Sequence, residues 1–293
     1  MNRAAERLSF AGKPNLLNQY RRALLAKGQK GVPTSLPEVI AQFSAIRAEA
    51  KKVAEYSRVC GFKDSKDVLP ITYPHILAFP LHMELMLHPE FPLALMGLVH
   101  IRNKITQHRA IGLKEKLDIY CSFSALTPTE QGLEFNIHTE VRVDDQIVWE
   151  SDSTNLARKL GALPRTAKAK EEQERFCASE TWKLATDLGR RYAKVSGDSN
   201  PIHLFALTAK LFGFKQHIAH GMWSKARAAA TLYPLLGSDK CEIGVEFKQP
   251  VFLPASANLY WNPLNEQSPN GSHFELWNSQ NDRVHVKGYI RSL

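Results

Sequence analysis

Residues 192–203 read Tyr-Ala-Lys-Val-Ser-Gly-Asp-Ser-Asn-Pro-Ile-His, which indicates the end of a helix followed by a bend. Gly197 can end the helix in a left-handed conformation, which most other residues avoid. Pro201 limits its own φ and pushes Asn200 out of the helical region. We therefore expect a tight and well-defined bend directly after the helix.

The bend has a chemical interpretation and a structural one. It can bring Asp198 and His203 to the same side of the chain, where a carboxylate and an imidazole could share one water molecule as an acid–base pair. In the structural interpretation Asp198 caps a turn, Asn200 makes an Asx turn and His203 is an ordinary loop histidine. Both remain open on these residues alone.

A second segment favours the chemical interpretation. His220 lies 17 residues after His203, and the chain continues through Gly221, Met222 and Trp223 into an apolar helix. At a helix start, a free backbone N–H lies at the positive end of the helix dipole and can stabilise a developing oxyanion. Gly221 is the candidate donor.

Together, the residue 192–203 motif and the His220-Gly221-Met222 helix start resemble the hydratase motif of the MaoC-like dehydratases, the (R)-specific enoyl-CoA hydratases of the hotdog fold. The resemblance covers about 120 residues, from roughly Phe176 to Leu293. It implies a long central helix wrapped by an antiparallel sheet, and a lyase of fatty acid metabolism. The implied reaction is syn addition of water to the 2,3 double bond of a trans-2-enoyl thioester.

The resemblance also implies residue roles. Asp198 and His203 jointly hold the water, and one accepts its proton while the other delivers a proton to the α-carbon. The Gly221 N–H donates to the thioester carbonyl oxygen. No metal or cofactor is implied, and coenzyme A or an acyl carrier protein serves as the substrate carrier. The residues expected to bind or orient the substrate are Asn200, Ser196, His220, Met222 and Trp223.

An internal repeat indicates how the whole chain is organised. Residues 56–61 (Tyr-Ser-Arg-Val-Cys-Gly) align with residues 192–197 (Tyr-Ala-Lys-Val-Ser-Gly) at an offset of 136, and each match ends at a glycine that can stop a helix. The economical architecture is α+β, a double hotdog in which each half wraps a curved antiparallel sheet around one long helix. We expect a degenerate N-terminal hotdog with a helical extension over 1–156, a linker over 157–175 and a catalytic hotdog over 176–293.

The first half departs from the motif. Phe62 stands where Asp198 stands, and no Asn-Pro-x-His sequence follows. At the expected copy of the helix start, near Pro80, the glycine is absent and the proline removes an N–H. This half is therefore expected to be inactive. The apolar residues between Ile76 and Met86 could line a cavity for the acyl chain or form an ordinary helix core.

Hydrophobic periodicity predicts the elements. Two helical patterns fall around residues 16–25 and 39–56, and later helices are expected near Pro80, over 185–195 and over 222–235. The predicted strands cover residues 116–126, 133–143, 146–155, 242–249, 257–262, 273–278 and 283–291. Turns are expected at 127–129, at 144–145 and at the Pro269-Asn270-Gly271 hairpin signal.

Net charge and cysteine spacing indicate the chemical type of the partner and the cellular compartment. The 293 residues contain 38 Lys and Arg against 29 Asp and Glu, a net charge of +9, and a surplus of seven cations lies within residues 1–60. This balance favours an anionic partner such as the phosphates of coenzyme A. A nucleic acid is not expected, because no basic helix with interleaved aromatic residues is present. The widely spaced cysteines fit a reducing cytoplasm, and no segment is apolar enough for membrane insertion. The cysteines are Cys60, Cys121, Cys177 and Cys241.

Several alternatives stay open. A hotdog thioesterase would release free thiol, whereas a non-catalytic acyl-thioester-binding protein would bind without turnover. The fused pair could act as a monomeric pseudo-dimer or as a homodimer. A histidine-rich region lacks carboxylate or cysteine partners at metal-ligand spacing, so we expect no metal there. Its members are His75, His82, His88, His100 and His108.

Overall fold

The computed structural model describes residues 5–63, 67–164, 176–262 and 271–293. Contacts divide these residues into two compact units, and each unit collects separate stretches of the chain. Unit 1 contains residues 5–47, 74–103 and 114–164. Unit 2 contains 48–63, 67–73, 104–113 and the described residues from 176 onward.

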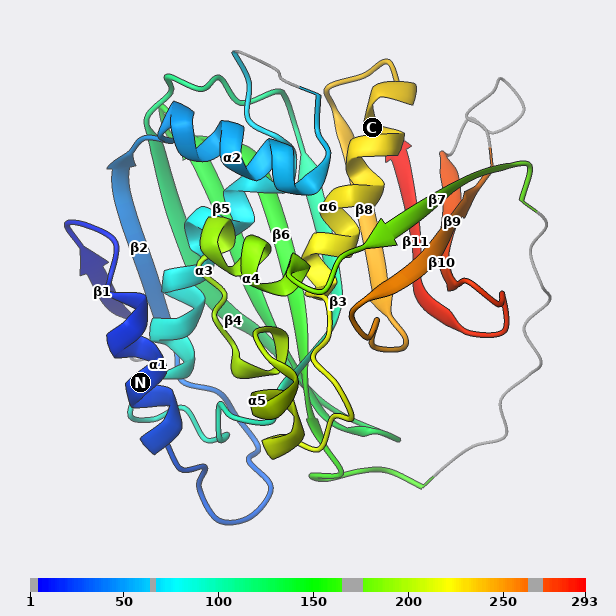
Figure 1. Ribbon diagram of the computed structural model, residues 1–293. Helices are drawn as coiled ribbons and strands as arrows, with labels where there is room; N and C mark the ends of the chain where they lie inside the picture. The colour runs from blue at the N-terminus through cyan, green and yellow to red at the C-terminus, as the bar shows by residue number, and fades with distance from the viewer. Residues whose placement is uncertain (1–4, 64–66, 165–175, 263–270) are drawn as a thin grey trace. The chain divides into compact units, whose positions relative to one another are not determined.

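Unit 1 is a largely antiparallel sheet with two helices (Figure 1). The sheet order is β1-β2-β4-β5-β6 followed by residues 99–103 of β3; the β1–β2 pair is parallel, and the β2–β4, β4–β5 and β5–β6 pairs are antiparallel. The strands are β1 (Glu6–Phe10), β2 (Val39–Ile46), β3 (Val99–Gln107), β4 (Leu117–Thr129), β5 (Gly132–Val143) and β6 (Gln146–Arg158). The helices are α1 (Leu16–Leu25) and α3 (Tyr73–Met86).

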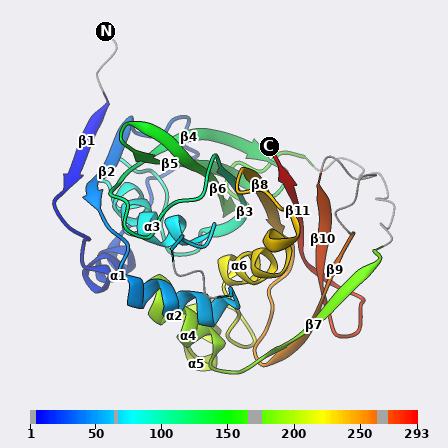
Figure 2. The same cartoon turned by 90° about the horizontal axis from the view of Figure 1, so that it is seen from above.

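Helix α3 is the buried helix of unit 1, and the strands curve around it (Figure 2). Ile76, Leu81 and Leu85 are buried core residues of this helix. The prediction that it begins near Pro80 is wrong, because it begins at Tyr73 and carries Pro80 inside. Pro74 in the first turn costs little, since the N–H it lacks would have had no helical partner. The helix start contains no glycine.

The predicted helical pattern over residues 39–56 is also only partly right. Residues 39–46 form strand β2, and the helix α2 covers Ala50–Cys60. Val39, Ala41 and Phe43 are buried in alternation with half-buried neighbours. The spacing of four between Val39 and Phe43 fits both a helical period of 3.6 and a strand period of 2, so the apolar pattern did not separate the two.

Unit 2 contains a run of antiparallel strands and the remaining helices. Its order is residues 104–107 of β3, then β8-β11-β10-β9-β7. The strands are β7 (Ala178–Leu184), β8 (Cys241–Phe247), β9 (Ala255–Trp261), β10 (Ser272–Asn278) and β11 (Val284–Ser292). The helices are α2, α4 (Leu188–Ser196), α5 (Ala206–Leu211) and α6 (Gly221–Leu232), with 3-10 turns η1 (Pro201–His203) and η2 (Tyr233–Leu235).

The two helices of the internal repeat pack against each other in unit 2. Helix α2 ends at Gly61 with φ of 81°, and α4 ends at Gly197 with φ of 82°. Both glycines therefore make the left-handed C-cap that the sequence predicts. The rings of Tyr56 and Tyr192, which occupy equivalent places in the repeat, lie 6.2 Å apart between their centroids.

The turn predictions have mixed outcomes. Asp144 and Asp145 form a turn with φ of 49° and 64°, as expected. The turn predicted at 127–129 is wrong, because β4 continues to Thr129 and the chain reverses over the next two residues. Pro269 and Asn270 of the hairpin signal and most of the 157–175 linker fall outside the described residues. Strands β1, β3 and β7 and helix α5 were not predicted.

Two further observations concern the whole described chain. Cys60, Cys121, Cys177 and Cys241 are all free thiols. Within the described ranges, no helix combines the length and apolarity needed to cross a membrane.

Candidate active site

The bend after α4 forms as the sequence predicts. The Gly197 N–H closes the helix on the Ala193 carbonyl at 2.8 Å. The Ser196 hydroxyl accepts a hydrogen bond from the Asp198 N–H at 3.2 Å. The Asp198 carboxylate in turn accepts from the Asn200 N–H, also at 3.2 Å. Ser196 and Asp198 therefore fix the chain direction by local hydrogen bonds.

Asn200 and Pro201 shape the next turn. The Asn200 side chain accepts from the Ile202 N–H at 3.3 Å, which is the Asx turn of the structural interpretation. Pro201 opens η1, which delivers His203. The two interpretations of this segment are thus compatible, because the turn that satisfies Asn200 also places the imidazole.

His203 is buried and its tautomer follows from its partner. Its Nδ1–H donates to the Ile218 carbonyl at 2.8 Å, so Nε2 carries the lone pair. Burial, together with a smaller contribution from the neighbouring His220, lowers the pKa of His203 to about 3. The side chain is therefore a neutral proton acceptor at physiological pH.

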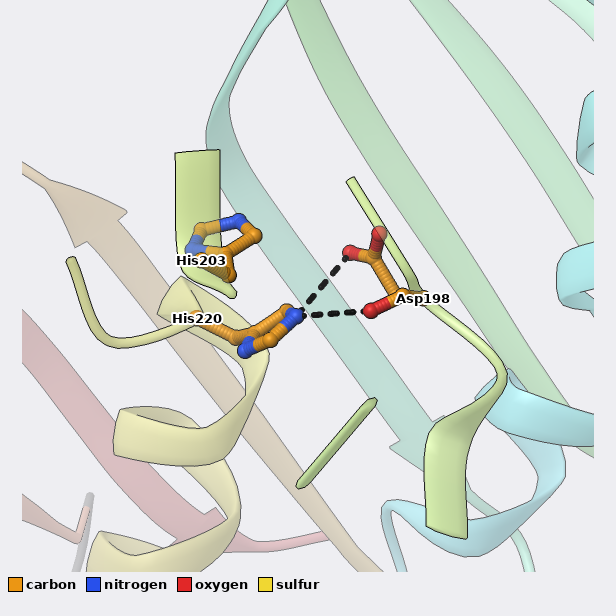
Figure 3. Close-up of side chains that lie close together, drawn as sticks. All are labelled: Asp198, His203 and His220. Carbon is orange, nitrogen blue, oxygen red and sulfur yellow. Dashed lines mark hydrogen bonds and ion pairs between the residues drawn. The ribbon is translucent and has the colours of Figure 1, made fainter. Parts of the chain in front are cut away.

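His220 contacts both His203 and Asp198 (Figure 3). Its ring stacks on that of His203 with centroids 3.7 Å apart. Its Nε2–H donates to the backbone carbonyl of Asp198 at 2.9 Å, and the same nitrogen lies 3.8 Å from the carboxylate. Burial lowers the pKa of His220 as well. Ligand-type atoms of Asp198, His203 and His220 lie within 4.8 Å of one another.

Gly221 is the first residue of α6, and the helix's own hydrogen bonds begin with the Trp223 N–H donating to the His220 carbonyl at 3.1 Å. The Gly221 N–H thus precedes the helical ladder and lies at the positive end of the helix dipole. A Cβ at Gly221 would lie 2.9 Å from the Phe247 ring. Glycine therefore lets the aromatic ring approach the helix start.

Met222 and Trp223 are placed differently from the other predicted site residues. Both are buried, and the Trp223 indole N–H donates to the Val59 carbonyl of α2 at 2.9 Å. The Trp223 ring meets Trp182 edge-on at 5.8 Å. Trp223 therefore packs into the core of unit 2, outside the Asp198–His203–His220 group.

Two contributors to the site were not predicted from the sequence. Tyr192 is fully buried with its ring 4.9 Å from that of His220. Gly189 lies where α4 passes the turn that carries His203, and a Cβ there would lie 2.0 Å from the His203 carbonyl oxygen. A glycine inside a helical pattern was the available signal for such a close approach.

The contact at Gly189 gives a testable prediction. Gly189→Ala must displace either α4 or the backbone of His203, so we expect a loss of about 1–3 kcal/mol in the free energy of unfolding and reduced turnover. Urea unfolding and the hydration rate measure the two effects. Gly12→Ala is the matched control, because no atom lies within 4 Å of its Cβ position. Equal stability of the two variants would contradict the prediction.

The histidines of unit 1 form a different arrangement. The rings of His75 and His82 lie 5.4 Å apart, those of His75 and His100 lie 6.1 Å apart, and His82 Nε2 hydrogen-bonds to Thr139 Oγ1 at 2.7 Å. Burial lowers the pKa of His82 to about 3. Within the described ranges, the set that could hold a metal ion is Asp198, His203 and His220 instead.

Comparisons with known proteins identify the family of the chain. Residues 167–268 match the MaoC like domain family. The chain is 31% identical over 260 residues to 3-hydroxyacyl-thioester dehydratase X of Mycobacterium tuberculosis, covering 88% of this chain and 91% of that protein. The chain belongs to the MaoC-like dehydratases. The crystal structure of the mycobacterial protein has a TM-score of 0.74 and covers 87% of the dehydratase chain described here and all of its own.

More distant structures share the fold of this dehydratase. A MaoC-like dehydratase from Phytophthora capsici has a TM-score of 0.72 at 18% identity, covering 87% of this chain and 95% of its own. An acyl-ACP thioesterase from Bacteroides thetaiotaomicron has a TM-score of 0.56 at 10% identity, covering 86% and 97%. The predicted α+β double-hotdog fold and the predicted dehydratase family, a class of lyases, are therefore confirmed. The thioesterase likeness concerns the fold alone.

Proposed function

We propose that this dehydratase catalyses the reversible addition of water to a trans-2-enoyl thioester, giving an (R)-3-hydroxyacyl thioester. The convergence of Asp198, His203 and His220 within 4.8 Å carries the proposal. Support also comes from the relative named 3-hydroxyacyl-thioester dehydratase. Conjugate addition needs a water-activating base, a proton donor and a contact for the developing enolate oxygen.

The first two needs fall to Asp198 and His203. In the hydration direction, the water oxygen bonds to C3 while one member of the pair accepts the water proton. As the resulting enolate collapses, the pair returns that proton to C2 on the same face, which completes the syn addition and leaves Asp198 and His203 in their starting protonation states. His203 suits proton transfer because its Nε2 lone pair is fixed by the Nδ1–H bond to Ile218. His220 holds the Asp198 backbone and stacks on His203, so it orients both partners.

Gly221 meets the third requirement, a contact for the developing enolate oxygen. As electrons of the double bond move toward the thioester carbonyl, negative charge develops on its oxygen. A backbone N–H at the start of α6 can bind that oxygen without rearranging, and such a donor contributes about 3–4 kcal/mol where its removal has been measured in other enzymes. Asn200, Ser196 and the local turns keep this machinery aligned.

The test is a coupled assay on crotonyl-CoA and on a longer trans-2-enoyl-CoA. Loss of the conjugated-thioester absorbance, followed by oxidation of the product with an (R)-specific 3-hydroxyacyl-CoA dehydrogenase, is the expected result. Release of free thiol instead would favour the thioesterase alternative. Binding of both thioesters without any turnover would favour a non-catalytic acyl-thioester-binding protein.

Metal ions give a separate prediction. Proton transfer by Asp198 and His203 requires no Lewis acid, so we expect EDTA to leave the hydration rate unchanged. Added Zn²⁺ is expected to inhibit, because two imidazoles and a carboxylate form a donor set that zinc binds, and the metal would occupy the lone pairs that the water needs. Steady-state rates with EDTA and with added Zn²⁺ measure both effects. Loss of activity in EDTA, restored by a metal, would contradict the mechanism.

A further inference from the structure

Four large apolar side chains lie exposed directly after the catalytic turn. Their exposed fractions are 53% for Phe205, 75% for Leu207, 79% for Leu211 and 36% for Phe212. We call these four residues the α5 patch. Exposed apolar side chains gathered this densely mark a binding surface more often than scattered ones do.

The α5 patch is held firmly against the catalytic turn. The Thr208 hydroxyl lies 2.7 Å from the Pro201 carbonyl and 2.9 Å from the Phe205 carbonyl. The Arg190 guanidinium of α4 donates to the Leu204 carbonyl at 2.9 Å. Helix α5 lies beside α4 in both overall views (Figures 1 and 2). The patch therefore begins two residues beyond His203 on a braced segment.

The charges around the patch have one sign. The sequence contains no aspartate or glutamate from residue 199 to residue 238. Arg190 lies over the Phe205 ring at 5.0 Å, Lys215 lies over the Phe252 ring at 4.6 Å, and Lys210 lies within α5 itself. Two nearby acids have partners: Asp187 pairs with Arg191 at 3.2 Å, and the Asp198 carboxylate lies 3.8 Å from His220 Nε2 in the candidate active site. The surface thus combines apolar side chains with cations.

We propose that the α5 patch docks a small acidic carrier protein that presents the enoyl thioester to the site on a phosphopantetheine arm. This inference rests on the proposed function and assigns its substrate carrier. Coenzyme A would use the cations through its phosphates but would leave Leu207 and Leu211 exposed. An acidic protein with an apolar contact face covers both features, and charge complementarity also speeds its encounter. Because the α5 patch begins two residues beyond His203, a carrier protein docked on it can extend its phosphopantetheine arm to the catalytic turn.

The experiment compares two carriers of the same acyl group. We would measure kcat/KM for crotonyl-CoA and for crotonyl carried by a bacterial acyl carrier protein, using the full chain. Leu207→Ser combined with Leu211→Ser, and separately Lys210→Glu, should each lower kcat/KM for the carrier-protein substrate by about 10-fold, the scale of interface residues that dominate binding. The leucine double variant should leave the value for crotonyl-CoA unchanged, whereas Lys210→Glu should lower the crotonyl-CoA value less than the carrier-protein value. Leu17→Ser combined with Leu24→Ser on α1 is the matched control, with exposed fractions of 72% and 62%.

Each other outcome overturns the docking proposal or separates it from the proposed function. Equal losses with both carriers would show that the patch acts through the site itself. Unchanged kinetics with the carrier protein would exclude docking, and binding to anionic phosphatidylglycerol vesicles that the same variants abolish would identify a membrane surface instead. If the wild-type protein hydrates neither substrate, the proposed function fails. Titration of the variants with the acyl carrier protein alone then still decides docking by the change in Kd.

Discussion

Asp198→Asn is expected to lower the hydration rate by at least about 10²-fold and to leave the protein folded, because a general acid–base group contributes on that scale. Asparagine keeps an oxygen that can accept from the Asn200 N–H, so the bend after α4 is preserved. It cannot accept or deliver the proton that the addition of water requires. The rate on crotonyl-CoA and the circular dichroism spectrum measure the two effects.

His203→Ala is expected to lower the hydration rate by the same factor as Asp198→Asn, because it removes the fixed Nε2 lone pair. A matched control exists in unit 1, where His138 and Asp152 form an aspartate–histidine pair with a 2.8 Å hydrogen bond. Asp152→Asn and His138→Ala should leave the hydration rate unchanged. If both site variants retained activity, or if the control pair lost as much, the assignment of Asp198 and His203 would be wrong.

The local part of the site could be predicted because short-range backbone rules govern it. Gly197 permits the positive φ that ends α4, and Pro201 fixes its own φ and keeps Asn200 out of the helical region, so the bend follows from residue types alone. The position of His220 in the site cannot be derived in this way, because it depends on backbone hydrogen bonds between residues that are far apart in the sequence. The Ile218 N–H donates to the Ile202 carbonyl at 3.1 Å, and the Ala219 N–H donates to the Val251 carbonyl at 2.9 Å. Only the family resemblance indicated His220.

The missed strand β3 shows where periodicity fails. Two of its buried positions are polar, Asn103 and Gln107, which breaks the apolar alternation that predicts a strand. The Asn103 amide donates to the hydroxyls of Ser151 and Ser153 in β6 at 2.9 and 3.1 Å. Gln107 donates to the Asp239 carbonyl at 2.8 Å. Burial of these amides is compensated by partners far away in the sequence, and a local pattern cannot reveal them.

Acidification from pH 7 to pH 4 is expected to destabilise the protein strongly through its buried histidines. Burial lowers the pKa of His82 and that of His203 to about 3, against about 6.5 in an unfolded chain. Below pH 6.5 the unfolded state therefore binds protons that the folded state does not. The stability that each neutral histidine contributes is present above pH 6.5 and is lost as the pH falls toward 3. Each contributes a slope of about 1.4 kcal/mol per pH unit, or about 3 kcal/mol by pH 4.

His82→Gln isolates this effect, because His82 lies in unit 1 and a glutamine amide can still hydrogen-bond to Thr139. Urea unfolding at pH 7, 6, 5 and 4 should show a slope smaller by about 1.4 kcal/mol per pH unit, with the hydration rate at pH 7 unchanged. His138 provides a control of opposite sign. Its hydrogen bond to Asp152 raises its pKa, so the stability it contributes is present in acid and lost as the pH rises through that pKa. His138→Gln should therefore leave the slope between pH 6 and pH 4 unchanged, because the contribution of His138 is already complete below pH 6.5. An identical slope in the two variants would contradict the burial of a neutral His82.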